Sequence, residues 1–122
     1  MEFLDMYVVH NDDRGCFYGI TDKYSWGEIN FIESNKCTKR GRHYHKFTKE
    51  LFYILEGRIK IDIFNLVTKE YHTFEAIPHM AFIIDPYEVH TFYTLAASKW
   101  INMLSHKLDN AKPDIFKCYE EP

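Results

Sequence analysis

Hydrophobic residues along this chain fall in short runs that are separated by polar or turn-forming segments. In residues 58–64, RIKIDIF, isoleucine occupies every second position and charged residues stand between the isoleucines. Side chains alternate between the two faces of a β-strand, so this pattern predicts a strand with one buried face. Residues 51–55, LFYIL, form a continuous apolar run closed by Glu56 and Gly57, and predict a second strand.

The rest of the chain repeats this organisation, with strand-like runs spaced about ten residues apart. The other predicted strands are residues 6–10, 16–20, 28–33, 69–76, 80–85, 90–95 and 99–104. No window keeps a helical period beyond about two turns, and the polar tail from residue 109 is expected to end as a loop or short helix. We therefore predict an all-β sandwich or barrel.

Length and composition narrow the class of protein. The 122 residues predict a single domain over 1–122, and the 46% hydrophobic content is sufficient for a full core. The formal net charge of -3 gives no electrostatic reason to expect a nucleic acid partner. No apolar stretch reaches the roughly eighteen residues of a membrane span, and the acidic N-terminal segment does not resemble a signal peptide. Three cysteines without a CxxC pair, Cys16, Cys37 and Cys118, predict free thiols in a cytoplasmic protein.

The segment RGRHYHKFTKE, residues 40–50, carries the candidate chemistry. In a strand His43 and His45 project from the same face, and Glu50 can fold back toward them at the start of the next apolar run. Two imidazoles and one carboxylate commonly bind divalent Zn, Fe, Mn or Ni. His90 is the best candidate for a fourth ligand, because it follows the turn-like DPYEV and opens a predicted strand.

Simpler interpretations of these residues stay open. A single histidine in a strand is more often a surface or hydrogen-bonded residue than a ligand, and an HxH pair alone is weak evidence. Glu50 and His90 can also be polar residues of a barrel interior that bond to each other. The HxH pair, the glutamate, Gly57 and a distant strand-initial histidine together are far more specific.

This constellation resembles the cupin family. The first cupin motif has a glycine, five residues, HxH, three or four residues, Glu, six residues and Gly; residues 43–57 follow it, although Cys37 stands at the leading glycine. In the second motif, DPYEVH keeps the histidine as His90, with Tyr87 at the glycine position. The resemblance covers about residues 28–104. It implies a small β-barrel that holds a metal ion inside by His43, His45, Glu50 and His90.

Two stretches are similar to cupins that act on nucleotide sugars, NDDRGCF at residues 11–17 and KRGRHYHK at residues 39–46. The dTDP-4-keto-6-deoxyhexose 3,4-ketoisomerases and the dTDP-4-dehydrorhamnose 3,5-epimerases carry comparable stretches. Both reactions move a proton beside a ketone, for which histidine is suited. The resemblance implies His43 and His45 as catalytic residues. It also implies Arg14 and Arg40 as ligands of the substrate diphosphate, which guanidinium groups bind well.

The differences between this sequence and the family motifs leave several alternatives open. The two arginines can be solvated turn residues. The ketoisomerases do not generally keep the glutamate and the distant histidine, so the metal-free mechanism does not transfer unchanged. The leading hypothesis is an isomerase or epimerase of a dTDP- or UDP-4-keto-6-deoxyhexose in surface-polysaccharide biosynthesis. A metal-dependent cupin acting on a small metabolite, as an oxygenase, lyase or isomerase, is the second, and a non-catalytic sugar-binding module is the third.

The expected partners follow from the leading hypothesis of a nucleotide-sugar enzyme. The substrate is a small nucleotide sugar, a divalent metal is the one cofactor considered, and no organic cofactor is expected. Exposed strand edges need to be covered, which predicts a homodimer, with the N-terminal residues 3–9 as a candidate interface. The sequence leaves open whether His43 acts as a base or as a metal ligand, because its lone pair cannot serve both in one step.

Overall fold

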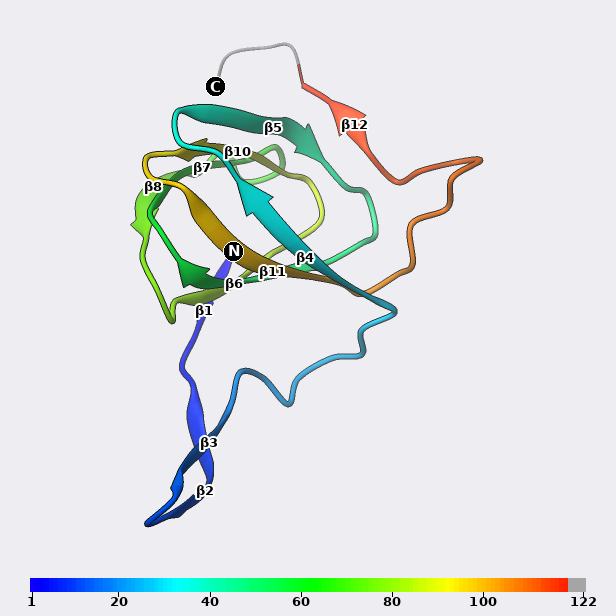
Figure 1. Ribbon diagram of the computed structural model, residues 1–122. Coiled ribbons are helices and arrows are strands. Elements are labelled where there is room, and N and C mark those ends of the chain that lie inside the picture. The colour runs from blue at the N-terminus through cyan, green and yellow to red at the C-terminus, as the bar shows by residue number, and fades with distance from the viewer. Residues whose placement is uncertain (119–122) are drawn as a thin grey trace.

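The computed structural model describes residues 1–118, which form two five-stranded sheets and one separate hairpin (Figure 1). The first sheet has the spatial order β1 (Glu2–Leu4), β9 (Ala81–Ile84), β6 (Glu50–Glu56), β11 (Ser98–Leu104) and β4 (Glu28–Ser34). The second has the order β12 (Phe116–Lys117), β5 (Thr38–Tyr44), β10 (Glu88–Thr94), β7 (Ile59–Asn65) and β8 (Tyr71–Ala76). The hairpin pairs β2 (Tyr7–Asp12) with β3 (Gly15–Gly19).

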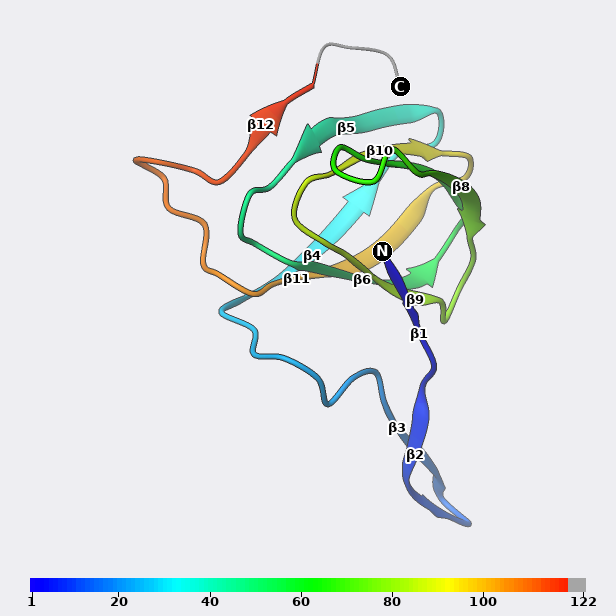
Figure 2. The same cartoon turned by 180° about the vertical axis from the view of Figure 1, so that it is seen from behind.

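Neighbouring strands run antiparallel throughout, and the two large sheets pack against each other as a jelly roll (Figure 2). The all-β prediction is confirmed. Each strand predicted from the hydrophobic pattern is present, with ends within two residues of the expected ones. The pattern missed β1 and β12, and it did not mark β5, whose residues TKRGRHY are almost all polar. In the tail the described residues contain β12 and turns rather than a helix.

The core lies between the sheets and explains the two clearest runs. The isoleucines at 59, 61 and 63 of β7 are fully buried, as the alternation predicted. In β6, Phe52 and Ile54 enter the core between the sheets. Leu51 and Tyr53 face the other way, into a second apolar cluster that includes Ile20 and Trp26. Residues 51–55 are apolar without alternation because both faces of β6 are covered.

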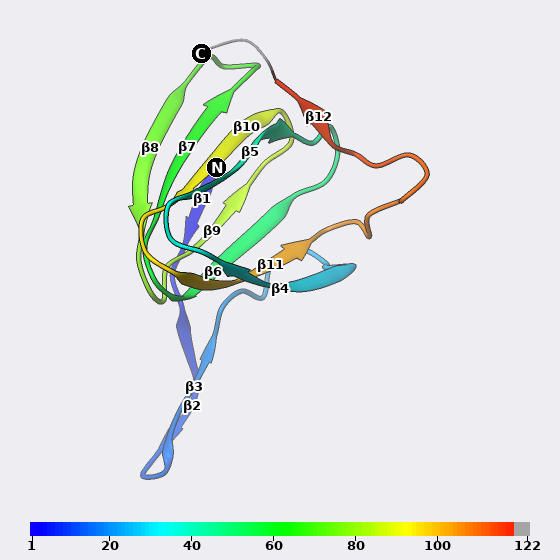
Figure 3. The same ribbon diagram turned by 45° about the horizontal axis from the view of Figure 1, so that its top comes forward.

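The hairpin β2–β3 extends away from the two sheets (Figures 1 and 3). Its apolar side chains are exposed, among them Val8, Val9, Phe17 and Tyr18. The expected N-terminal strand over residues 3–9 is therefore two strands, since β1 joins β9 in the first sheet and β2 joins β3 in the hairpin.

The structure of residues 1–118 also bears on the predictions for the cysteines and for a membrane span. No disulfide bond joins Cys16, Cys37 or Cys118 within residues 1–118. Over residues 1–118, no helix is long and apolar enough to cross a membrane.

Candidate functional site

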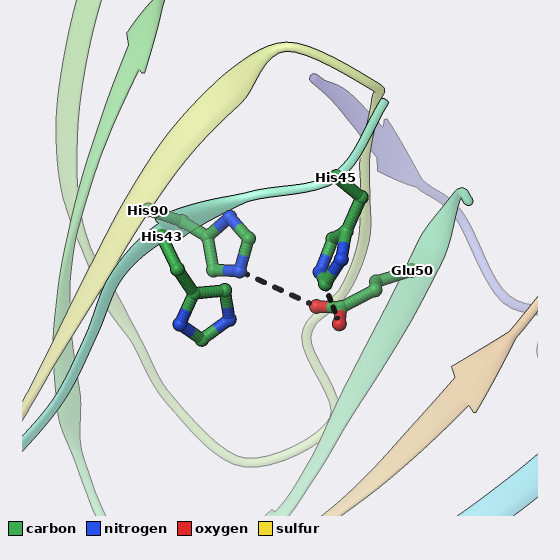
Figure 4. Close-up of side chains that lie close together, drawn as sticks. All are labelled: His43, His45, Glu50 and His90. Carbon is green, nitrogen blue, oxygen red and sulfur yellow. Dashed lines mark ion pairs between the residues drawn. The ribbon is translucent and has the colours of Figure 1, made fainter. Parts of the chain in front are cut away.

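Four side chains predicted to act together meet inside the barrel: His43, His45, Glu50 and His90 (Figure 4). One potential ligand atom from each lies within 4.8 Å of all the others. His43 and His90 are opposite each other in the β5–β10 register, with ring centroids 4.5 Å apart. Glu50, at the start of β6, faces them from the other sheet. The structure thus brings Glu50 and His90 together with the two other histidines, and their role as metal ligands stays a prediction.

The atoms at the centre of this cluster face one another rather than other groups of the described chain. Glu50 places one carboxylate oxygen 2.7 Å from His45 Nε2 and the other 3.5 Å from His90 Nε2. Despite these distances, His45 Nε2, His90 Nε2 and Glu50 Oε2 have no partner in hydrogen-bond geometry within the described chain, and all three are buried. A buried polar atom without a partner costs about 1–3 kcal/mol. Three such atoms converging on one point fit a bound divalent cation better than a hydrogen-bonded polar core.

Backbone carbonyls fix the orientation of two of the imidazole rings. His90 Nδ1 donates to the carbonyl oxygen of Glu88 at 2.9 Å, and His45 Nδ1 donates to that of Asp114. A carbonyl oxygen only accepts, so both Nδ1 atoms carry hydrogen and both Nε2 atoms face Glu50. This arrangement of the second ring nitrogen is the usual one for metal-binding histidines.

His43 differs from the other two histidines. Its ring is only partly buried and lines an open cavity, and no backbone carbonyl among residues 1–118 accepts a hydrogen bond from it. Burial, followed by the neighbouring His90, lowers the pKa of His43 to about 4, although Glu50 acts in the opposite direction. His43 is therefore neutral at physiological pH, which both a metal ligand and a proton acceptor require.

The other three groups of the cluster are also strongly perturbed. Burial lowers the pKa of His90. Burial favours the uncharged forms of Glu50 and His45, but their mutual attraction outweighs it, so the pKa of Glu50 is lowered and that of His45 is raised. A cation bound here would replace the proton that His45 gains beside Glu50, so metal binding is expected to release a proton.

Asp114, which the sequence did not single out, holds the turn that carries His45. Its carboxylate accepts the backbone N–H groups of Lys46, Phe47 and Thr48 at 2.8, 3.0 and 2.9 Å. Burial alone would raise the pKa of Asp114, but these donors outweigh it and lower the value. The residue lies more than sixty positions from His45 in sequence, so no local pattern could have revealed it.

Replacing Asp114 with alanine is expected to weaken metal binding without emptying the site. The three N–H groups lose their acceptor, and the carbonyl that orients His45 becomes free to shift. Loss of such a supporting contact typically costs 10- to 100-fold in metal affinity. Competition with a fluorescent chelator measures the dissociation constant, and Asp109→Ala, in the exposed loop, is the control. An unchanged dissociation constant would show that the turn holds His45 without Asp114.

Two cavities adjoin the cluster. The large cavity, about 670 Å³, opens between β4, β11 and β6 on one side and β5 and β10 on the other. Three cationic side chains and three aromatic rings line it: Arg40, Arg42, Lys117, Phe52, Phe92 and Trp100. Lys39 also borders it, but its ammonium group lies over the ring of Tyr93, which is not part of the lining. The small cavity, about 210 Å³, lies beside His45 under the segment 106–115. Glu50 and Asn102 line both cavities.

A bulge in β5 places consecutive residues on the large cavity. The β5–β10 register shifts between His90 and Thr91, which lie opposite His43 and Gly41, so the register skips Arg42, whose φ is positive at 60°. Strict alternation would have pointed Arg42 away from His43, yet residues 39–43 all line the cavity. Gly41 permits the close approach, because its φ is 106° and a Cβ there would lie 2.5 Å from the His90 carbonyl oxygen. The glycine of the RG pair is therefore a backbone requirement.

The two arginines predicted to bind the substrate diphosphate lie in different parts of the structure. Arg40 lines the large cavity, whereas Arg14 lies in the hairpin and pairs with Asp12 at 2.6 Å, away from that cavity. Substrate binding by Arg14 stays a prediction, and it requires the hairpin to reach the cavity of a second chain. Tyr44 points away from the histidines, as expected, and packs against Tyr87 and Phe116.

The two departures from the cupin motifs occupy left-handed backbone. Cys37 and Tyr87 stand where the motifs have glycine, and their φ angles are 62° and 64°. The backbone geometry that favours glycine is thus retained although the glycines are not.

Cys37→Gly is accordingly expected to stabilise the fold by about 0.5–1 kcal/mol, since it removes the left-handed strain of an exposed side chain. The free energy of unfolding in urea checks this, with Cys37→Ala as the control that keeps a Cβ. Equal stability of the two variants would contradict the role assigned to this backbone position.

Comparison with known proteins identifies a family for this chain. The model of the polysaccharide biosynthesis C-terminal domain matches residues 10–116. The chain belongs to this family. No curated protein sequence matched the chain.

Solved structures confirm the cupin-like fold. The capsular polysaccharide assembling protein CapF of Staphylococcus aureus is 21% identical with a TM-score of 0.68; the match covers 93% of this chain but 32% of CapF, so this chain spans about a third of it. The sugar 3,4-ketoisomerase QdtA of Thermoanaerobacterium thermosaccharolyticum, solved with TDP, is 18% identical over 97% of this chain and 86% of its own, with a TM-score of 0.72. The 3,5-epimerase RmlC of Legionella pneumophila, solved with dTDP-4-keto-L-rhamnose, is 19% identical over 93% and 69%, with a TM-score of 0.72.

Proposed function

We propose that the protein is an isomerase or epimerase of a nucleotide-linked 4-keto-6-deoxyhexose in surface-polysaccharide biosynthesis. The observation that carries this proposal is the large cavity, where His43 stands beside Arg40, Arg42 and Lys117. The family and the ligands named for QdtA and RmlC, TDP and dTDP-4-keto-L-rhamnose, support it. The test is whether dTDP- or UDP-4-keto-6-deoxyglucose is converted to a product with a new NMR spectrum. No product from either compound would contradict the proposal.

The cavity suits the two halves of such a substrate. Arg40, Arg42 and Lys117 supply positive charge for a diphosphate, and a guanidinium group can bind it in bidentate fashion. Phe52, Phe92 and Trp100 provide an apolar wall that fits a deoxygenated sugar. His43 lines the same cavity, so a sugar bound there would lie close to it.

We propose that His43, His45, Glu50 and His90 together hold one divalent ion, with His43 on the side of the large cavity. The buried unpartnered atoms and the fixed ring orientations fit such an ion. When bound, it supplies a Lewis acid beside the sugar carbonyl. Proton abstraction by His43 is the competing role, which its neutral ring permits, and His45 would then assist. Metal content separates the two: a His43→Ala protein that keeps its ion but loses turnover would assign the base role to His43.

Action on a small metabolite is the second candidate, and the complete set of three histidines and one glutamate favours it as a metal cupin. The size of the large cavity and the cationic residues on its lining favour the nucleotide sugar instead, because a diphosphate and a base would fill space that a small metabolite leaves empty. Titration with dTDP and UDP distinguishes the candidates. The cytoplasmic location and the single domain over residues 1–122 stay predictions, and the free thiols support the former.

A homodimer remains the proposed assembly, and the hairpin β2–β3 is its proposed contact. An isolated two-stranded hairpin is marginally stable in water, and this one exposes Val8, Val9 and Phe17. The edge strand β4 also exposes Phe31 and is unpaired on its outer side within residues 1–118. A second copy of the chain would cover both.

We therefore expect a dimer at micromolar concentration in gel filtration with light scattering. Phe17→Asp should shift it toward monomer by roughly tenfold or more in dissociation constant, since an interface anchor typically contributes over about 1.4 kcal/mol. Val67→Asp, at an equally exposed turn, is the control. A monomeric wild-type protein would contradict the proposed assembly.

A further inference from the structure

The side-chain amide of Asn102 forms part of the wall shared by the two cavities, and the sequence gave no reason to select it. Asn102 lies on β11, is only 7% exposed, and lines both cavities together with Glu50. It pairs in register with Asn30 of β4. Polar side chains at this depth of an apolar sheet face are uncommon unless they bond to a partner or a ligand.

A chain of hydrogen bonds determines which end of the Asn102 amide faces the cavities. Glu28 accepts the backbone N–H of Leu108 at 3.2 Å through one carboxylate oxygen, and Asn30 Nδ2 at 2.8 Å through the other. Asn30 must present its NH₂ group, because a carboxylate oxygen accepts and a carbonyl oxygen cannot donate. The same NH₂ group donates to Asn102 Oδ1 at 3.1 Å.

This orientation turns the Asn102 NH₂ group away from Asn30. Among residues 1–118 no protein group accepts a hydrogen bond from Asn102 Nδ2, although the oxygen of the same amide is bonded. Asn102 thus presents two N–H donors to the cavities, beside a carboxylate and three histidines. A preorganised neutral donor of this kind suits an oxygen that gains negative charge during a reaction.

The proposed reaction generates such an oxygen. When the proton leaves the carbon beside the ketone, the C–H electron pair forms a carbon–carbon double bond and the carbonyl π pair moves onto oxygen. The result is an enolate oxygen, and reprotonation at carbon reverses these changes. We propose that the NH₂ group of Asn102 donates a hydrogen bond to this sugar oxygen, with Asn30 and Glu28 as positioning residues that fix its orientation. This inference rests on the proposed function.

Steady-state kinetics with the 4-keto-6-deoxyglucose nucleotide that the wild-type protein turns over tests this inference. Asn102→Asp keeps the shape and still accepts from Asn30, but it replaces the NH₂ group with oxygen. We expect kcat to fall by about 100-fold or more, with KM changed far less. Asn110→Asp, in the exposed loop, controls for the added negative charge.

Glu28→Gln tests the orienting chain without touching the donor. A glutamine at residue 28 allows Asn30 to turn around, and Asn102 then turns its oxygen toward the cavities in part of the molecules. We expect a smaller fall in kcat, roughly 3- to 10-fold, as in a mixed population of two orientations. Equal melting temperature and metal content in all variants shows that fold and cluster are intact.

The outcomes are distinct. A lower kcat in Asn102→Asp with a partial effect in Glu28→Gln supports the inference. Full activity of Asn102→Asp, or a rise in KM alone, overturns it while the proposed function stands. Should Asn102→Asp lose its fold or its metal, Asn102→Ser takes its place, and undiminished kcat there overturns the inference equally. Absence of turnover by the wild-type protein with any 4-keto-6-deoxyglucose nucleotide overturns both.

Discussion

His90→Ala is expected to reduce bound metal from about one ion per chain to near none, because it removes a buried ligand whose ring is fixed by the Glu88 carbonyl. Chelation of the wild-type protein should have a parallel effect on stability. A ligand present at about 100 times its dissociation constant adds roughly 2.7 kcal/mol, and its removal should lower Tm by about 10 °C for a chain of this size.

Metal analysis of protein purified without added metal, followed by melting curves with and without chelator, measures both effects. His72→Ala is the matched control, since His72 is an exposed histidine on β8 that lies outside the cluster. A chelator-insensitive Tm, in a protein that also stays empty after incubation with Zn, Fe, Mn and Ni, would contradict the metal site. The four residues would then be a polar core with unpaired atoms, which the buried nitrogens of His45 and His90 make energetically costly.

Gly41→Ala is expected to lower the free energy of unfolding by about 2–4 kcal/mol. An added Cβ would lie 2.5 Å from the His90 carbonyl oxygen and 3.2 Å from Thr91 Cα. Both are backbone atoms of β10, so they can move only by shifting the strand that carries His90. Urea unfolding in the presence of chelator measures this effect without a contribution from metal binding.

Gly15→Ala separates the clash from the backbone strain. Gly15 also has a positive φ, of 144°, but nothing lies within 4 Å of an added Cβ. Its replacement should therefore cost less than that of Gly41. If the two variants were equally stable, the close approach of β5 to β10 at the bulge would not be what requires glycine in the RG pair.

The hydrophobic period predicted the sheets because burial of alternate side chains is a local property of each strand. Isoleucines 59, 61 and 63 show this most clearly. The same period pairs His43 with His45, while Glu50 and His90 were found by their positions at strand starts. The period failed at Arg42, where the bulge breaks alternation, and it did not mark β5, whose sequence is polar because that strand faces a cavity.

The remaining parts of the site depend on contacts between distant segments. Asp114 and Asn102 acquire their roles from hydrogen bonds to residues about seventy positions away, for which no local pattern exists. Lys117 reaches the large cavity only because β12 pairs with β5. Cys37 and Tyr87 appeared as departures from the cupin motifs, and only the backbone angles show that the glycine-type conformation is kept.

Solvent exchange in deuterated water tests whether the protein moves a proton beside a sugar ketone in this cavity. Wild-type protein, with and without its metal, is incubated with dTDP- and UDP-4-keto-6-deoxyglucose, and deuterium at each sugar carbon is measured by NMR. We expect enzyme-dependent uptake at C3 or C5 with at least one nucleotide, and its loss in Arg40→Ala/Arg42→Ala protein that keeps its fold. No uptake with either nucleotide by metal-loaded protein would contradict it.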